Sequence, residues 1–288
     1  MNNLKAVLLF VLLCGLLLAA GYFIAGQGGL IAALVLAIAL IAVSYWFSDK
    51  VALAMIGAKE VGPADEPRLH AIVEEVASVA RLPKPRVYVV PNDSPNAFAS
   101  GRNSAHAAVG VTSGALRFLD DRELTAVVGH EFGHIQNHDT LTNAVVATAA
   151  GAIMFVAMMG RWTTFFGAFG SRGSTSALVG LVAWPAMVLF APLAAALARL
   201  AVSRGREYGA DKAAISLTHM PLALAGALEK LEAHSLLQPL PMNPGVAHMF
   251  IVNPLGSVSL STMFATHPPV KDRIKRLQET AGLTEMHA

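Results

Sequence analysis

The sequence predicts a mainly α-helical integral membrane protein with about four transmembrane helices and a small α+β domain outside the lipid. Of the 288 residues, 55% are hydrophobic and 14% are charged, which is too apolar for an ordinary soluble domain. The apolar residues gather in four long runs, and the segments between them have the composition of a soluble domain. The net charge is only +2 and the basic residues are scattered, so nucleic acid is a poor candidate partner.

The first two apolar runs are predicted to form a transmembrane hairpin over residues 1–47. Residues 4–25 are almost wholly apolar and long enough to cross a hydrocarbon core of about 30 Å. Residues 30–47 follow after a short glycine-rich link, which favours a hairpin over a cleaved signal peptide. Cys14, the only cysteine, lies in the first run, so any metal must be bound by histidine and carboxylate groups.

Residues 48–142 are predicted to be the first part of the domain outside the membrane. An amphipathic helix is expected over 66–81 and a β-strand over 86–90. A second strand is expected over 95–101, paired with 107–111 after a polar turn. The edge of such a small sheet can hold an extended peptide through backbone hydrogen bonds, although a plain core hairpin is an equally open alternative.

A His-Glu-x-x-His stretch, from His130 to His134, is expected inside the next helix, for which Asp120 and Asp121 are candidate N-caps. Histidines four residues apart lie one turn apart on one helix face, so both imidazoles can reach a single metal ion. Glu131 then points toward the open coordination position, where it can take a proton from a metal-bound water and pass it to a leaving amine. This pattern is typical of zinc metalloproteases, and the alternative is a solvated helix face without a metal.

Residues 143–200 are predicted to be a second transmembrane pair. The apolar runs 144–160 and 177–200 flank a segment rich in glycine, serine and threonine, and a buried helical pair in a globular core is the alternative. Basic residues next to the runs place the termini and the domain in the cytoplasm; they are Lys5, Lys50, Arg199, Arg204 and Arg206.

Residues 201–288 are predicted to complete the domain outside the membrane. A helix is expected to open at Ser203, and two more are expected over 222–233 and 270–281, each with a proline in or just before its first turn. Residues 235–263 are rich in proline, glycine and asparagine, which predicts a mobile loop that could cover the site.

A catalytic zinc needs three protein ligands, and Glu207 is the best candidate for the third. Asp211 follows one helical turn later, where it could accept the spare imidazole N–H of a histidine ligand. A helix-start carboxylate paired with Arg204 or Arg206 is the alternative for Glu207. His138 is a weaker candidate, because a further turn of the same helix would carry it about 6 Å away from the shared metal.

These motifs together resemble the HtpX family of membrane-embedded zinc endopeptidases. The resemblance extends over nearly the whole chain, including the order of its membrane and soluble parts. It rests on His130-Glu131 and His134 before an apolar hairpin, on Arg206-Glu207-Tyr208-Gly209-Ala210-Asp211, on Thr266-His267-Pro268, on Arg273-Ile274 and on Pro95-Asn96-Ala97-Phe98-Ala99. His138 departs from the family pattern, in which glycine is more frequent at this position.

The resemblance implies a gluzincin-type domain with one Zn²⁺ held by His130, His134 and Glu207, and with Glu131 as the general base. It further implies that His267 stabilises the tetrahedral oxyanion, with help from Asn96. The remaining implied positions form or order the substrate-binding part of the site: Asn96, Ala97, Phe98, Ala99 and Arg273.

The resemblance also implies a cellular role. It suggests cleavage of misfolded or damaged membrane proteins during stress, at the bacterial inner membrane. The expected partners are polypeptide substrates, the lipid bilayer and other quality-control proteases. Two rival functions are a membrane scaffold or chaperone with a closed structural zinc site, completed through His138, and an enzyme confined to prenylated C-terminal peptides. The second rival would need a large chamber walled by more than four membrane helices.

Overall fold

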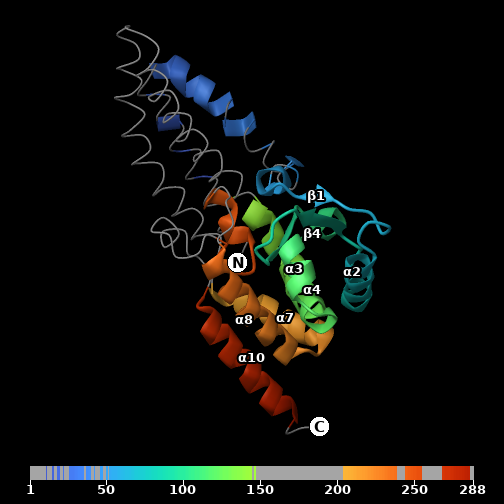
Figure 1. Cartoon of the computed structure of the whole chain (residues 1–288). Helices are drawn as coiled ribbons and strands as arrows, with labels where there is room; N and C mark the ends of the chain where they lie inside the picture. The colour runs from blue at the N-terminus through green and yellow to red at the C-terminus, as the bar shows by residue number, and fades with distance from the viewer. Residues whose placement is uncertain are drawn as a thin grey trace, which may run out of the picture.

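The computed structural model describes residues 52–144, 146, 204–238, 244–254 and 268–285, together with scattered positions between 11 and 50 (Figure 1). The predicted spans at 4–25, 144–160 and 177–200 lie wholly or largely outside these residues, as does His267, and the span at 30–47 is described only in part. Within the described residues, no helix combines the length and the apolar composition that crossing a bilayer requires. Four transmembrane helices therefore remain a prediction.

A small mixed sheet is the centre of the described domain. Its order is β1 (Lys59–Glu60), β2 (Arg86–Val90), β4 (Ala107–Thr112) and β3 (Ala97–Gly101). The β2 and β4 strands are parallel, whereas the outer two pairs are antiparallel. The strand expected over 86–90 and the pairing of the next two strands are confirmed; the two-residue β1 was not predicted.

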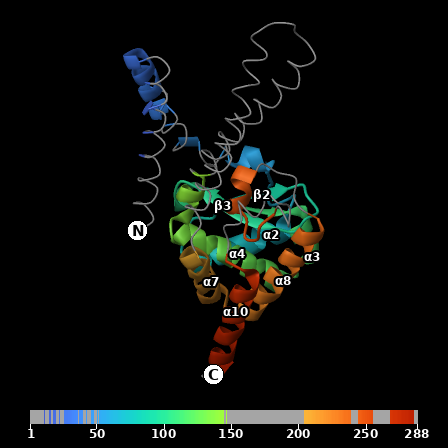
Figure 2. The ribbon, with the colours of Figure 1, turned by 90° about the vertical axis from the view of Figure 1, so that its left-hand side faces the viewer.

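Helices cover the sheet in successive layers (Figures 1 and 2). The α4 helix (Asp121–Gln136) packs against β3 on one side and against α7 (Arg204–Thr218) and α8 (Pro221–Leu237) on the other. The outermost layer is α10 (Val270–Glu285), which packs mainly on α8. Further described helices include α2 (Pro67–Ala80), α3 (Ser113–Phe118), η1 (Ser104–His106) and η2 (Pro244–Met249).

The α4 helix is fixed at its start by a capping box. The Asp120 carboxylate accepts a hydrogen bond from the backbone N–H of Glu123 at 2.8 Å, and the Glu123 carboxylate accepts one from the backbone of Asp120 at 3.0 Å. Lys230 of α8 also contacts Glu123 at 2.7 Å, so the start of α4 is tied to the neighbouring helix. The middle of α4, with its two histidines, is thereby held on a rigid element.

The sheet is buried on both faces, because side chains alternate along each strand. Val87, Ala97 and Val109 point into the main core with α2 and α4. Tyr88, Phe98 and Ala108 point the other way, into a second cluster with Leu53 and Phe250. This double burial explains why β3 and β4 contain an almost unbroken run of small and apolar residues.

One prediction for the second half of the domain is wrong. Residues 244–254 are not part of a mobile loop, because η2 forms and residues 246–252 are buried, with an antiparallel bridge from Phe250 to Phe98. Arg206 is also buried, which the sequence did not predict. It is 7% exposed and its Nε lies 3.4 Å from the Oδ1 of Asp139.

Candidate metal centre

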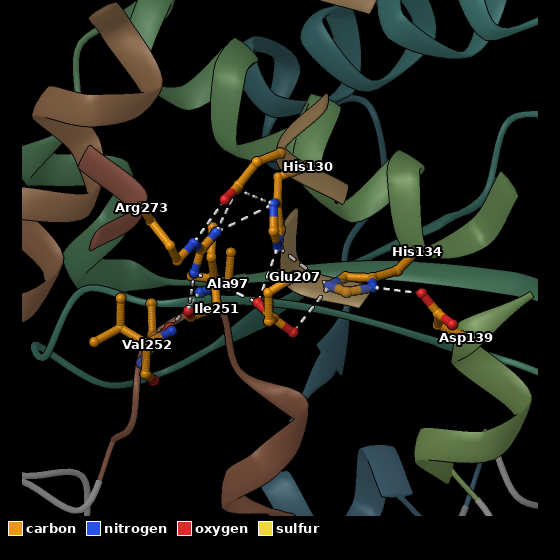
Figure 3. A network of polar contacts seen from close by, with 10 residues as sticks. Ala97, His130, His134, Asp139, Glu207, Ile251, Val252 and Arg273 are labelled. Carbon is orange, nitrogen blue, oxygen red and sulfur yellow. Dashed lines mark hydrogen bonds and ion pairs between the residues drawn. The ribbon is translucent and has the colours of Figure 1, made fainter. Parts of the chain in front are cut away.

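Three potential ligands meet between α4 and α7 (Figure 3). His130 and His134 project from α4 and Glu207 from α7, and their ligand atoms all lie within 4.8 Å of one another. The two Nε2 atoms are 3.1 Å apart, and each lies 3.7 Å from an oxygen of Glu207. Two histidines on a tetrahedral zinc, with Zn–N bonds of about 2.0–2.1 Å, would place their nitrogens roughly 3.3 Å apart. The residues present therefore fit a zinc ion.

Close packing of the two helices makes this meeting possible. Gly133 lies against α7, where an added Cβ would come within 2.9 Å of the Cα of Ala210 and the Cβ of Ala213. One turn earlier, a Cβ on Gly129 would approach the Thr218 side chain at 2.7 Å. The glycines on either side of the His-Glu pair thus let α7 approach closely enough to bring Glu207 to the histidines.

Glu131 is buried beside these ligands without a hydrogen-bond partner for either oxygen among the described residues. It is 1% exposed, and burial raises its pKa to about 8, with the charge of Glu207 acting in the same direction and His134 opposing it. A buried carboxyl without partners is costly unless it serves something at the site. A cation with a water molecule in its open position would supply that partner, which is a second observation in favour of a metal.

The His130 side of the centre is held by an aspartate and an arginine from distant elements. The Oδ1 of Asp211 lies 2.9 Å from the Nδ1 of His130, and Arg273 bridges both oxygens of Asp211 at 2.6 and 2.9 Å. Arg273 is fully buried and also lies 3.4 Å from Glu207. Burial would raise the pKa of Asp211, but Arg273 and His130 outweigh it and lower the pKa to about 2. Asp211 is therefore a fixed negative charge.

The His134 side contains a group that sequence reasoning missed. The Oδ2 of Asp139 lies 3.2 Å from the Nδ1 of His134, and Asp139 is completely buried (Figure 3). Burial lowers the pKa of His134, but Asp139, Glu207 and Glu131 outweigh it and raise the pKa to about 9. For His130, burial has a larger effect than the hydrogen bond to Asp211 and lowers the pKa to about 4. The only available signal was an acidic residue just past the end of the predicted zinc helix.

His138 does not join the cluster. Its side chain is exposed, and its backbone adopts the left-handed region with φ 57°, directly after α4 ends at Gln136. The group of described residues that could hold a metal contains His130, His134 and Glu207. Glycine is favoured at a left-handed position, so the conformation of His138 would suit glycine better than histidine.

The predicted substrate strand is partly occupied by the chain itself. The backbone N–H of Ile251 donates to the carbonyl of Ala97 at 3.0 Å, and the Asn96 side chain donates to the carbonyl of Val252 at 2.9 Å. Arg273 in turn donates to the carbonyl of Ile251 at 3.0 Å. In this structure Asn96 therefore serves to hold residues 251–252 against the start of β3.

Comparison with known proteins identifies the family of this chain. The model of "Peptidase family M48" matches residues 63–281. A "Protease HtpX homolog" of Sulfurihydrogenibium sp. is 46% identical over 286 residues, covering 97% of this chain and 96% of that protein. A "Protease HtpX homolog" of Desulfatibacillum aliphaticivorans is 45% identical over 276 residues, covering 96% of this chain and 89% of that protein. The crystal structure of S. mikatae Ste24p overlaps 96% of this chain but only 65% of its own length, with a TM-score of 0.46 and 16% identity. From the family match and the sequence relatives, the chain belongs to the HtpX family within peptidase family M48 and is a metalloprotease.

Proposed function

We propose that the chain is a membrane-bound, zinc-dependent endopeptidase that cleaves misfolded or damaged membrane proteins. The observation that carries the proposal is the meeting of His130, His134 and Glu207 around one point, with the unpartnered carboxyl of Glu131 beside it. Three ligands leave a fourth position open, which distinguishes a catalytic zinc from a structural one.

Each residue then has a defined task in hydrolysis. When bound, zinc polarises the scissile carbonyl and lowers the pKa of the attacking water. Burial raises the pKa of Glu131 to about 8, and a cation bound beside it would lower that pKa, so that the carboxylate can take the proton of that water and pass it to the leaving nitrogen. Asp211 fixes the tautomer of His130, and Arg273 holds Asp211 in place. His267, outside the described residues, is proposed as a donor to the oxyanion on the family resemblance.

The substrate is proposed to add as a strand to the outer edge of β3. Alternate residues of a strand direct their backbone groups to the same edge, so Ala99 and Gly101 face the edge at which Ala97 accepts from Ile251. Because α4 packs on β3, a peptide along this edge would run beside the metal ligands. Backbone pairing is independent of side chains, which suits an enzyme for unfolded segments of varied sequence.

Membrane attachment is supported by composition and by exposed apolar side chains. At the described positions before residue 50, large hydrophobic side chains are exposed to an extent unusual for a soluble protein. They are Val11, Tyr22, Leu30, Ile31, Leu34, Val35, Ile38, Trp46 and Phe47. We propose that the protein lies in the bacterial inner membrane with this domain in the cytoplasm. The quality-control role, and other proteases as partners, are proposed from the family resemblance.

The proposal is tested by substituting Glu131→Gln in the full chain, purified in detergent with zinc. We expect the variant to retain one zinc per chain and to lose cleavage of an unfolded membrane protein by a factor of at least about 1,000, because the proton acceptor is gone. A variant that maintains membrane proteins in cells as well as the wild type would favour a scaffold or chaperone. A wild-type protein without zinc would overturn the metal assignment.

A further inference from the structure

We infer that Asp139, held by Arg206, is a positioning residue that orients the His134 imidazole toward the metal. The inference rests on the proposed zinc site and adds two residues to it. Asp139 is not in the His-Glu-x-x-His motif and touches none of the reacting atoms. Its effect on the reaction is therefore exerted through His134, the ligand that it contacts.

The contacts of His134 divide its two nitrogens between two tasks. Its Nε2 faces the Nε2 of His130 at 3.1 Å and an oxygen of Glu207 at 3.7 Å, which is the point where the ligands converge. Its Nδ1 lies 3.2 Å from the Oδ2 of Asp139 (Figure 3). An aspartate there accepts the Nδ1 proton, so the lone pair of the neutral ring is left on Nε2.

The backbone after α4 is shaped to bring Asp139 back to His134. Five residues along a continuing helix correspond to about 500°, so Asp139 would lie roughly 140° away from His134 around the axis. The helix instead ends at Gln136, and His138 takes a left-handed conformation. A left-handed residue just past a helix end reverses the direction of the chain, and residues other than glycine adopt it at some steric cost. The unusual turn therefore coincides with the placement of a buried carboxylate on a metal ligand.

Arg206 supplies the charge that such a burial requires. Its Nε lies 3.4 Å from the Oδ1 of Asp139, and both side chains are buried. Arg206 directly precedes Glu207 in α7, so one turn of helix provides both the third ligand and the guanidinium beside Asp139. The arrangement repeats that of Asp211 and Arg273 on the other histidine, using different elements.

The test measures zinc affinity in the full chain in detergent, by competition with a chelator of known affinity. For Asp139→Ala we expect 10- to 100-fold weaker zinc binding, the usual loss when such a supporting carboxylate is removed. For Asp139→Asn, whose amide oxygen can still accept the Nδ1 proton, we expect a loss of about three- to tenfold. Asp65→Ala, at an exposed turn away from the centre, should leave the affinity unchanged.

Affinity separates positioning from a purely structural role, because a structural residue would change thermal stability without changing zinc binding by the folded protein. Asp139→Ala that folds and binds zinc like the wild type would overturn the inference. If Asp139→Ala does not fold, Asp139→Asn with wild-type affinity would overturn it. Failure of the proposed function looks different, since the wild type itself would then bind no zinc or Glu131→Gln would still cleave.

Discussion

The two histidines of the centre are supported in different ways. His130 depends on residues 81 and 143 positions further along the chain, Asp211 in α7 and Arg273 in α10. His134 is contacted by Asp139, only five positions away, just past the turn that follows α4. The His130 side therefore depends on two distant helices that assemble with α4, whereas the His134 side combines a local turn of backbone with one distant residue, Arg206 of α7.

This difference indicates where metal binding and folding are coupled. Arg273 donates to the Ile251 carbonyl, which lies on the edge of β3, as well as to Asp211. Zinc bound by His130 and Glu207 would stabilise the contact of α10 with the rest of the domain, because ligands that bind only the folded state stabilise it. The His134 side adds affinity without adding much long-range structure. Variants that damage one side or the other should separate these two effects.

The largest effect is expected for Arg273→Met, which disrupts the His130 side. The variant would leave Asp211 buried without its cation, a change that typically costs about 3–5 kcal/mol of unfolding free energy. We expect a lower midpoint of thermal unfolding and weaker zinc binding together, measured on the same preparation. Lys275→Met is the matched control, because the Lys275 side chain is 77% exposed on α10 and lies 4.0 Å from the exposed carboxylate of Glu279.

Arg273→Met with a wild-type unfolding midpoint would mean that Asp211 is neutralised in some other way. The coupling of the His130 side to folding would then be wrong. A variant that is destabilised but binds zinc normally would show that Arg273 supports the fold alone.

The next effect is expected for Gly133→Ala, which acts on both sides at once. The new methyl group would meet the Ala210 backbone at 2.9 Å and must push α7, with Glu207, away from the histidines. We expect a loss of about 1–3 kcal/mol of unfolding free energy, as for overpacking in a core. Gly209→Ala in α7 is the control, since its nearest contact is 3.6 Å and alanine favours a helix. Equal stability of the two variants would contradict the close-packing argument.

The two histidines should also differ in charge before the metal binds. The pKa of His134 is raised to about 9 and that of His130 is lowered to about 4, so at pH 7 the His134 ring carries a second proton and is charged, whereas the His130 ring is neutral. Zinc must displace that proton, and the displacement becomes easier as pH rises. We expect zinc affinity to increase between pH 7 and 9, by up to about tenfold per pH unit, and to level off above pH 9.

Isothermal titration in buffers with different ionisation enthalpies would count the protons released. Release of a proton at pH 7 and of almost none at pH 10 is the expected pattern. An affinity that is flat between pH 7 and 9 would show that Asp139 and Glu207 do not keep His134 protonated.

The sequence was most informative where local patterns determine structure. The capping residue Asp120, the β-branched and aromatic residues of β2 and the spacing of His130 and His134 are local signals, and each is found in the structure. Contacts between distant segments left no local signal. The pairing of Ile251 with Ala97 turned an expected mobile loop into buried structure, because apolar residues between prolines gained a sheet edge to pack on.

The supporting residues of the site follow the same rule. Asp211 could be suggested from sequence because it lies one helical turn from Glu207, whereas Asp139 could not, because its position depends on the left-handed turn at His138. From the sequence, Arg206 was predicted to be a charge that flanks the membrane. Its burial could not be predicted, because it depends on where α7 packs. Helical periodicity does not describe residues beyond a helix end.

The smallest effect is expected for His138→Gly, which relaxes the turn on the His134 side. Glycine adopts a φ of 57° without the steric cost of roughly 1 kcal/mol that a Cβ imposes, but it also gains freedom in the unfolded chain. We expect a net stabilisation of up to about 1 kcal/mol, seen as a slightly higher unfolding midpoint, with zinc affinity unchanged because the exposed imidazole is not a ligand. His138→Ala keeps the strain and removes the same imidazole, so it should match the wild type in both measurements. A large loss of zinc affinity in both variants would instead make His138 a fourth ligand, close the open position, and turn the centre into a structural site.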